Sequence, residues 1–508
     1  MPQVKQPSTL RSIAMRKFLK VVCRTCTTWI TELSSAAEAG NRNYLQYAER
    51  VLNECDMLHE ILTPLPMHIL ESLSTKAIDK FIKIITLYDV KSDSRLKLAP
   101  WYDKEQHNAI CKNMLRSVLL PCTSKHNTKG ISSSFAQRLI IQTLDSTCNL
   151  TSLFLSTLTE TDHSAILASN IRHLKNLKFF QYAYHCTDQV VQQLALHCKA
   201  LCYINLTNSS SVTDVSVHYM LELRKLTYVH MLGTSVTSES YRLLIAELPQ
   251  IKNFITFTPS NEILENIAAE NLSTITYFFG SVGNMALLTE KCPNIIFLTV
   301  YYRNEDLSHL TVLAGLVSLH VVIGNYELFN LTTGLNGIGH RLIELGLYMV
   351  DNVNVTDIIN LCSGLKRLFL EYCVFVPLEY GTVLNTEILH FKSVTSLKIK
   401  SNFQRQCNYP SMRYYANLEV LECVGLDFLD NDFMCGALQQ GAFRSLKYLL
   451  IKETGNSALT MRIVDLLIRH CEHLKVLGHL KTWQQLTRSM IRDLKQRIML
   501  RNLDLRIV

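Results

Sequence analysis

The stretch Cys362-Ser-Gly-Leu365-Lys-Arg-Leu368-Phe-Leu370-Glu-Tyr-Cys373 decides how the sequence folds, because its pattern recurs along most of the chain. Apolar residues hold the first, fourth and usually the sixth position of a short segment that here begins at Leu365. Fifteen such segments follow one another at a mean spacing of about 25 residues. They begin at Leu150, Leu174, Leu201, Leu226, Ile251, Leu272, Ile295, Leu316, Leu342, Leu365, Val394, Leu418, Leu446, Leu474 and Leu500.

A repeat of this length predicts a solenoid in which one short strand and one helix make each turn. Amphipathic segments such as 188–197 and 461–469 suit the outer helices. The predicted fold class is therefore α/β, a horseshoe of about 15 repeats over residues 149–508. Glycine (18 residues) and proline (11 residues) are scarce, which fits stacked turns that need few tight reversals.

Cysteine recurs at one place in these repeats. Cys198, Cys292, Cys362 and Cys471 each stand three residues before the first apolar position. These segments resemble the cysteine-containing leucine-rich repeats that are common in F-box and related intracellular proteins. The resemblance covers about 360 residues. A buried cysteine behaves as a small hydrophobe, so we expect these thiols to face the core.

Composition excludes several other classes of protein. Apolar residues make up 48% and charged residues 19% of the 508, which excludes a disordered chain. The net charge of +8 is too dilute to predict nucleic-acid binding. The longest nearly apolar stretch, Thr311 to Gly324, is too short to span a bilayer, so we expect no membrane segment.

Cysteine usage and the start of the chain indicate the compartment. Sixteen cysteines are far fewer than a disulfide scaffold needs, and the start lacks the apolar region of a signal peptide. We therefore expect reduced cysteines in the cytoplasm or nucleus. A secreted or receptor-type repeat protein is a third, weaker hypothesis, which glycan on the sequons would favour. These sequons lie at Asn149, Asn205, Asn208, Asn271, Asn330 and Asn354.

No motif of catalysis, cofactor binding or metal binding is present in the sequence. It contains no P-loop, no G-x-S-x-G, no H-E-x-x-H and no glycine-rich dinucleotide turn. Cys23 and Cys26 form a lone C-x2-C, whereas a zinc site needs four ligands. His197, His470 and His473 adjoin repeat cysteines and suit helix ends. We expect no enzyme activity, no cofactor and no metal.

The concave strand surface is the candidate site for binding a target protein. Residues between the inward leucines are expected to point onto it, and many are aromatic with few charges among them. Such a face suits protein recognition, because aromatic anchors dominate interface hot spots. The candidate residues are Phe154, Tyr203, Tyr228, Phe297, Tyr301, Tyr348, Arg367, Phe369, Glu371 and Tyr448. The same reading also places there Phe180, Phe257, Phe278, Lys178, Glu344, Lys398, Lys400 and Glu422.

The other parts of the chain form a helical head and two ends of the solenoid. Residues 1–120 lack the repeat and predict helices over about 8–33, 41–62 and 67–87, and residues 121–148 form a boundary or first cap. Residues 483–499 predict a basic amphipathic cap helix, followed by a last strand that begins at Leu500. Its Arg488, Arg492, Lys495 and Arg497 are best read as a solvated face.

The first helix of the head carries a candidate docking motif. Residues 9–18 (TLRSIAMRKF) resemble the BC box, the elongin C-binding helix of VHL-box and SOCS-box proteins. Leu10, Ala14 and Phe18 stand at i, i+4 and i+8, on one face that could enter a partner groove, and Ile13 adjoins them. The family usually has cysteine where this chain has Ala14.

A second motif lies 46 residues further on. Leu65-Pro66-Met-His-Ile69-Leu-Glu-Ser-Leu73 resembles the cullin box that accompanies the BC box. The same Leu-Pro-x-x-Ile-Leu core opens F-boxes, although the later Cys-Lys/Arg-x-Trp signature is missing. PRAME-like and zyg-eleven-like proteins combine elongin-binding helices with leucine-rich repeats, and this chain looks like that arrangement.

These resemblances imply a non-enzymatic substrate receptor of a cullin-RING ubiquitin ligase. Its head would bind elongin B/C with a cullin, or a Skp-type adaptor, and its solenoid would hold an unknown target protein. The alternative is a leucine-rich-repeat scaffold whose helical head is only a cap, with no link to ubiquitin ligases.

Overall fold

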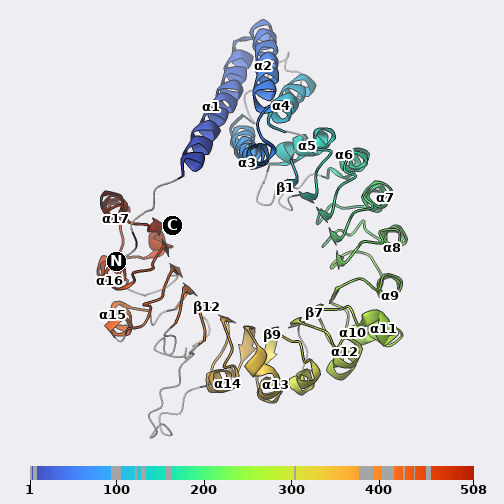
Figure 1. Ribbon diagram of the computed structural model, residues 1–508, viewed down its shortest axis with the longest axis vertical. Helices are drawn as coiled ribbons and strands as arrows, with labels where there is room; N and C mark the ends of the chain where they lie inside the picture. Colours follow the sequence, from blue (N-terminus) through green and yellow to red (C-terminus); the bar gives the residue numbers. More distant parts are fainter. Residues whose placement is uncertain are drawn as a thin grey trace. The chain divides into compact units, whose positions relative to one another are not determined.

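The structure is a computed structural model of the chain (Figure 1). It describes residues 3, 9–92, 104–119, 123–127, 133–155, 162–301, 305–376, 393–401, 417–426, 429–439, 441–452 and 459–508. The chain divides into two compact units, residues 8–255 and residues 256–508 together with the first seven residues. Both are built from parallel strands that alternate with helices. The fold is a leucine-rich-repeat solenoid of the α/β class with an N-terminal helical region, as predicted.

The N-terminal helical region contains α1 (Leu10–Ala39), α2 (Asn41–Leu62), α3 (Met67–Ser92) and α4 (Lys104–Val118). Gly40 joins α1 to α2 at φ 122°, a backbone region that glycine adopts readily. The core of this region includes Trp29 and Phe81 and extends to Ile140 of the first repeat. α1 is longer than predicted, and α4 was not predicted as a separate helix.

The unit 8–255 also contains a five-stranded parallel sheet with the order β1-β2-β3-β4-β5. Its first strand, β1, lies in the predicted boundary segment and pairs with β2, so Lys125 stands opposite Ser152. The elements of this part are β1 (Lys125–Asn127), α5 (Ser134–Gln142), β2 (Ser152–Phe154), α6 (Ser164–Asn170), β3 (Phe179–Gln181), α7 (Asp188–His197), β4 (Tyr203–Asn205), α8 (Asp214–Met220), β5 (Tyr228–His230) and α9 (Ser238–Glu247).

The remaining strands form an eleven-stranded sheet that runs in order from β6 to β16. Its first elements are β6 (Asn253–Thr256), α10 (Ser260–Leu264), α11 (Ala269–Leu272), β7 (Tyr277–Gly280), α12 (Met285–Lys291), β8 (Phe297–Tyr301), β9 (Ser318–Asn325), α13 (Leu331–Ile338), β10 (Glu344–Asp351) and α14 (Val355–Leu361). It continues with β11 (Arg367–Glu371), β12 (Ser396–Lys400), β13 (Val420–Val424), α15 (Asn431–Gln439), β14 (Tyr448–Lys452), α16 (Met461–His470), β15 (Val476–Gly478), α17 (Arg488–Leu500) and β16 (Arg506–Ile507).

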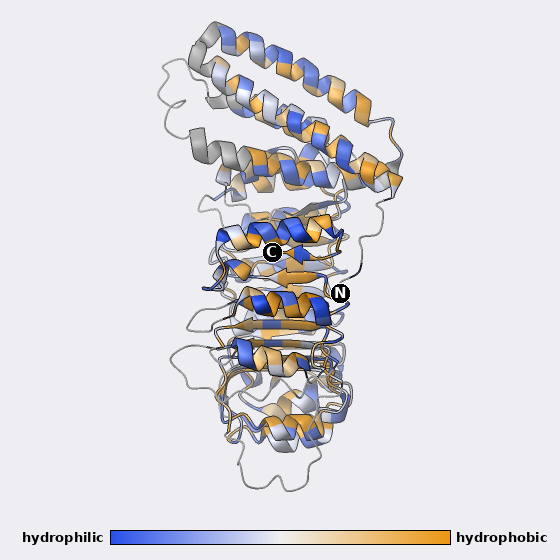
Figure 2. Cartoon of the chain, turned by 90° about the vertical axis from the view of Figure 1, so that its left-hand side faces the viewer, coloured by the Kyte–Doolittle hydropathy of each residue, from blue (hydrophilic) through white to orange (hydrophobic). Residues whose placement is uncertain are grey.

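Strands such as β4, β8, β11, β12 and β13 bury every second residue, which is what the repeat pattern predicts. In β11, for example, Leu368 and Leu370 are fully buried while Arg367, Phe369 and Glu371 are not. The hydropathy colours in Figure 2 accordingly change between hydrophobic and hydrophilic along the helices and strands. Among the described residues, no helix is both long and apolar enough to cross a bilayer.

Three of the fifteen predicted segment starts were wrong. Leu174 and Leu272 are both buried, but the first apolar positions of their repeats are Leu177 and Ile275, three residues later. Leucine here occupies the place that cysteine takes in other repeats, which produced the false start. The last strand also begins later than predicted: Leu500 is 74% exposed, and β16 begins at Arg506.

Threonine and aspartate link the helices of successive repeats. Thr187, Thr213 and Thr237 each cap a helix by accepting a hydrogen bond from a backbone N–H two or three residues later. The backbone N–H and hydroxyl of Thr213 also donate to Asp188 of the preceding helix, at 2.9 and 2.8 Å. Thr237 donates to Asp214 in the same way. The helix starts are thereby held at a fixed offset from one repeat to the next.

Candidate protein-recognition sites

In each of the two units, the strand side chains that alternate with the buried apolar residues form a surface that we term the open face. In β3–β5, β8 and β11–β14, for example, these side chains are at least partly exposed. All ten residues predicted for target binding lie on this face and are exposed or half-buried: Phe154, Tyr203, Tyr228, Phe297, Tyr301, Tyr348, Arg367, Phe369, Glu371 and Tyr448.

Two further aromatic residues placed on this surface by the sequence lie instead in the core. Phe180 and Phe278 are fully buried, because both follow the false segment starts. Their neighbours Phe179 and Phe279 take the outward positions. The period-2 alternation of the strand, counted from the correct start, would have found both. Lys178 precedes β3 and is not part of the strand.

An aromatic cluster occupies the start of the open face in the unit 256–508. The ring of Tyr301 lies edge-on to Phe257 and Phe279, with centroids 5.8 and 5.0 Å apart, and the Phe257 and Phe279 centroids are 6.5 Å apart. Phe257 is 57% exposed and Phe297, in the adjoining row, is 44% exposed. Rings held by one another and still open to solvent are suited to anchoring an apolar side chain of a partner.

Further along the same sheet, β10 carries a half-buried carboxylate with three partners. Glu344 accepts a hydrogen bond from Arg367, faces His320 Nε2 at 2.7 Å and accepts from Ser318 at 3.3 Å. Burial alone would raise the pKa of Glu344, but the hydrogen bonds from Arg367 and His320 outweigh it and lower the pKa below its ordinary value. The charge of Glu344 is therefore kept and compensated inside the open face.

His320 also belongs to an aromatic group on the same strands. Its ring centroid lies 5.6 Å from that of Tyr348 and 5.9 Å from that of Phe369. The Tyr348 ring lies over Gly346, where an added Cβ would stand 2.7 Å from it. Burial and the carboxylate of Glu371 raise the pKa of Tyr348 to about 12. His320 is not among the residues predicted for the open face, although its place between Leu319 and Val321 gives the period-2 signal.

A chain of alternating charges continues along the open face. Lys400 pairs with Glu371 at 3.0 Å, and Lys398 pairs with Glu371 at 3.2 Å and with Glu422 at 3.6 Å. The register places these residues on three neighbouring strands, because Glu371 stands opposite Lys400 and Lys398 opposite Glu422. Because these lysines and glutamates pair with one another, the row of charges adds almost no net charge to the open face. It therefore suits a partner that is recognised by shape and polar contacts.

The residues predicted to bind an adaptor differ in their exposure. Leu10 is 83% exposed and Ile13 is 38% exposed; Ala14 and Pro66 are also exposed. Phe18 and Leu65 are half-buried and pack with Met15 and Leu58 against a small cluster of Leu62, Leu70 and Leu73. Ile69 is half-buried. Leu73 is only 2% exposed, so it is a core residue of the head and does not fit the docking role that its motif suggests.

The repeat cysteines face the core. Burial raises the pKa of the Cys198, Cys292, Cys362 and Cys471 thiols, each to about 12. A thiol with such a pKa stays protonated at neutral pH and is a poor nucleophile. Within the part of the chain that the structure describes, no group of three or more His, Cys, Asp and Glu residues is placed to hold a metal ion.

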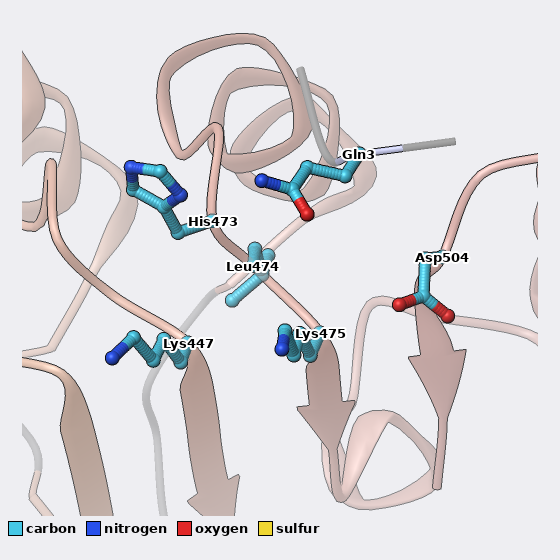
Figure 3. A pocket seen from close by; sticks show the side chains of 6 residues that line it. All are labelled: Gln3, Lys447, His473, Leu474, Lys475 and Asp504. Carbon is cyan, nitrogen blue, oxygen red and sulfur yellow. The ribbon is translucent and has the colours of Figure 1, made fainter. Parts of the chain in front are cut away.

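A small pocket lies beside the last strands (Figure 3). Its volume is about 90 Å³, whereas pockets for small organic ligands measure about 300–1,000 Å³. The backbone N–H of Asp504 donates to the carbonyl of Gln3 at its rim, at 2.6 Å. The six side chains that line it are Gln3, Lys447, His473, Leu474, Lys475 and Asp504. Water or a small ion would fill a space of this size.

Comparisons with known proteins give folds and no family. No family model matches the sequence, and no curated protein matches it either. The structure of the Rad7 and Elc1 complex in yeast is 14% identical with a TM-score of 0.40, covering 89% of this chain and 94% of that one. A leucine-rich-repeat protein of Leptospira interrogans is 15% identical with a TM-score of 0.34, covering 78% and 92%. An internalin from Listeria monocytogenes is 14% identical with a TM-score of 0.34, covering 72% and 88%.

Proposed function

We propose that this protein is a non-enzymatic substrate-recognition subunit of a cullin-RING ubiquitin ligase. Its helical head binds elongin B/C, and its open face binds the target protein. One observation carries the proposal: Leu10, Ile13 and Ala14, which open the BC-box-like helix, are exposed. The cullin-box-like segment at Leu65 lies near the same helix, because Leu65 and Phe18 contact one small cluster although 46 residues separate them.

The long spacer is a helical hairpin. From Phe18 the chain follows α1 to Ala39, turns at Gly40 and returns along α2 to Leu62. The outward and return paths are each about 32 Å long at 1.5 Å per residue. Equal arms bring the chain back to its starting level, so the spacer length does not keep the two motifs apart.

The exposed ends of the two motifs support adaptor binding. Leu10, Ile13 and Ala14 form an apolar stripe on the first turns of α1 that no described residue covers. A stripe with i, i+3 and i+4 spacing is the form in which one helix enters a groove on another protein. The Leu10 side chain is not buried in the isolated chain. Burying it in an adaptor groove would contribute about 2 kcal/mol to the binding free energy.

Co-purification of the full chain with elongin B/C tests the head. The variant Leu10→Ser with Ile13→Ser changes only exposed side chains, so it should fold as wild type does and lose elongin. The matched control is Val21→Ser with Leu45→Ser, which removes two other exposed apolar side chains of the head and should retain elongin. The BC-box proposal would be contradicted if the first variant retained elongin, or if the wild-type chain captured a Skp-type adaptor in place of elongin.

The aromatic cluster is the part of the open face on which we expect a target to depend most. Proteins captured from cells by the intact chain should include partners that a Phe257→Ala, Phe297→Ala variant no longer captures. Leu196→Ala with Leu243→Ala is the control, because both leucines are exposed on helices rather than on the open face. A target that binds both variants equally would have to be held elsewhere.

The second candidate function is a leucine-rich-repeat scaffold without a ubiquitin ligase. It is favoured by the inward packing of Phe18 and Leu65, which would then be ordinary core residues of the head. In that case neither elongin B/C nor a Skp-type adaptor co-purifies, while proteins bound to the open face still do. We place either function in the cytoplasm or nucleus, where thiols stay reduced.

A further inference from the structure

The excess positive charge of the chain is concentrated at its C-terminal end. Residues 459–508 contain ten Lys and Arg but four Asp and Glu, so this tenth of the chain holds six of the eight net positive charges. The rest of the molecule is close to neutral. A local excess of this kind raises the concentration of negatively charged partners near one surface.

The exposed side of α17 holds three of these cations in one row. Arg488, Arg492 and Lys495 stand at i, i+4 and i+7, which places them on one face over about 10 Å. All three are exposed, and none forms an ion pair with any described residue. Arg497, by contrast, pairs with Asp465 at 3.2 Å. α17 itself contains a single acidic residue, Asp493.

The same row ends in apolar side chains. Met499 stands at i+11 from Arg488 and is 69% exposed, and the adjacent Leu500 is 74% exposed. These are among the most exposed large apolar residues described in the chain, together with Leu10. A solvated cap surface gains nothing from exposing them. Cations followed by apolar side chains are complementary to a partner that carries both carboxylates and apolar groups.

The arrangement also acts against the stability of the helix. Like charges one turn apart repel, and the chain offers these three no carboxylate partner among the described residues. On its other face, α17 already buries Ile491, Leu494 and Ile498. The exposed row is therefore not needed to hold α17 in place.

We propose that the outer face of α17 (Figure 1), made of Arg488, Arg492, Lys495, Met499 and Leu500, binds an acidic segment of a partner protein that also presents apolar side chains. This surface is distinct from the head and from the open face, so it does not rest on the proposed ligase function. A membrane is a poorer fit, because the apolar face of α17 is buried and two side chains give little area for insertion. A nucleic acid would use the cations but not Met499 and Leu500.

Fluorescence anisotropy with the full chain tests this surface. The probe is a labelled 20-residue peptide with Leu at i, i+3, i+4 and i+7 spacing and Glu at the positions opposite, which gives one apolar and one acidic helical face. Wild type should bind it, and Arg488→Gln with Arg492→Gln and Lys495→Gln should weaken binding by about tenfold. Met499→Ser with Leu500→Ser should weaken it by a few-fold and leave its salt dependence unchanged, because no charge is lost.

Three comparisons guard against non-specific attraction. The variant Lys175→Gln, Arg224→Gln, Lys225→Gln removes the same charge from exposed positions elsewhere and should bind as wild type does. A scrambled peptide of the same composition should bind more weakly than the probe. The proposal is overturned if the scrambled peptide binds equally well, if the triple variant at α17 binds as tightly as wild type, or if a 20-nucleotide single strand or phosphatidylserine vesicles outcompete the peptide at equal charge.

Discussion

The carboxylate of Asp188 holds the backbone N–H and the hydroxyl of Thr213, which lies one full repeat further along the chain, at 2.9 and 2.8 Å. The hydroxyl of Ser216 donates to the same carboxylate. Thr213 is also the residue that caps the next helix, so one side chain of α7 fixes where α8 begins. The link therefore joins two repeats at their helix starts.

Replacing Asp188 with Ala should destabilise the chain by about 1–2 kcal/mol, because two polar groups of the cap lose their partner at once. The measurement is the midpoint of the first urea-induced unfolding transition followed by circular dichroism. Glu239→Ala is the control, since Glu239 also lies in the first turn of a helix and, among the described residues, forms an ion pair only with Arg242 of its own helix, at 3.5 Å. Its effect should stay below about 0.5 kcal/mol. Equal effects of the two variants would contradict a role for the link between repeats.

Glu344 should make stability depend on pH in the acid range. Its pKa in the folded chain lies below the ordinary value of about 4.3, so its contribution is fully present above that pH and is lost as the pH falls through the folded pKa. Glu344→Gln should cost about 1–2 kcal/mol at pH 7, and the gap to wild type should close as the pH falls below about 4. Glu419→Gln, which breaks an exposed pair with Lys447, should cost less than about 0.5 kcal/mol. A gap that stays constant from pH 7 to pH 3 would show that the ion pair is not its source.

Gly280 should not tolerate a side chain. Its φ is 152°, and an added Cβ would stand 1.8 Å from the carbonyl oxygen of Thr256 on the neighbouring strand. Gly280→Ala should therefore cost about 2 kcal/mol or more, measured by thermal or urea unfolding. Gly436→Ala is the opposite case, because this glycine lies in α15 with nothing near its Cβ, and the change should stabilise by about 0.5–1 kcal/mol. Opposite signs are the expected result, and a stable Gly280→Ala would contradict the close approach of the two strands.

Leu73 and Leu10 should respond oppositely to truncation, although both belong to docking motifs in the sequence. Leu73→Ala should cost about 2–4 kcal/mol, since the side chain is buried with Leu62 and Leu70. Leu10→Ala should leave the unfolding midpoint within about 0.5 kcal/mol of wild type, since the side chain is 83% exposed. A large loss of stability for Leu10→Ala would mean that the first turns of α1 are part of the core, and it would remove the reason to expect an adaptor there.

The repeat and its strands could be predicted from the sequence because a strand that buries every second residue has apolar residues two positions apart, and this spacing recurs in each repeat. The misplaced starts at Leu174 and Leu272 have a physical cause. The position three residues before the first apolar position of a repeat is also buried, and leucine fills it there as well as cysteine does. The sequence cannot separate two buried aliphatic residues that stand three positions apart, and the error carried Phe180 and Phe278 to the wrong face.

The candidate sites were less accessible to prediction than the fold. The aromatic and charged residues of the open face follow from alternation alone, but the partners of Glu344 do not, because Ser318 and His320 come from the preceding repeat and Arg367 from the following one. In the head, periodicity could place Leu10 and Phe18 on one face. Periodicity could not predict that α2 brings Leu65 to the same cluster as Phe18, or that Leu10 stays exposed.

The parallel register has a consequence for how such a chain can evolve. Glu371 stands opposite Lys400 although 24 residues separate β11 from β12, whereas only 15 residues separate β10 from β11. The spacing between strands, about 4.8 Å, is set by the backbone ladder and not by the length of the connection. Insertions and deletions between strands can therefore accumulate without shifting the recognition residues past one another. Each residue on the open face can then change by single substitutions, because its neighbours on the inside of the strand already hold the position.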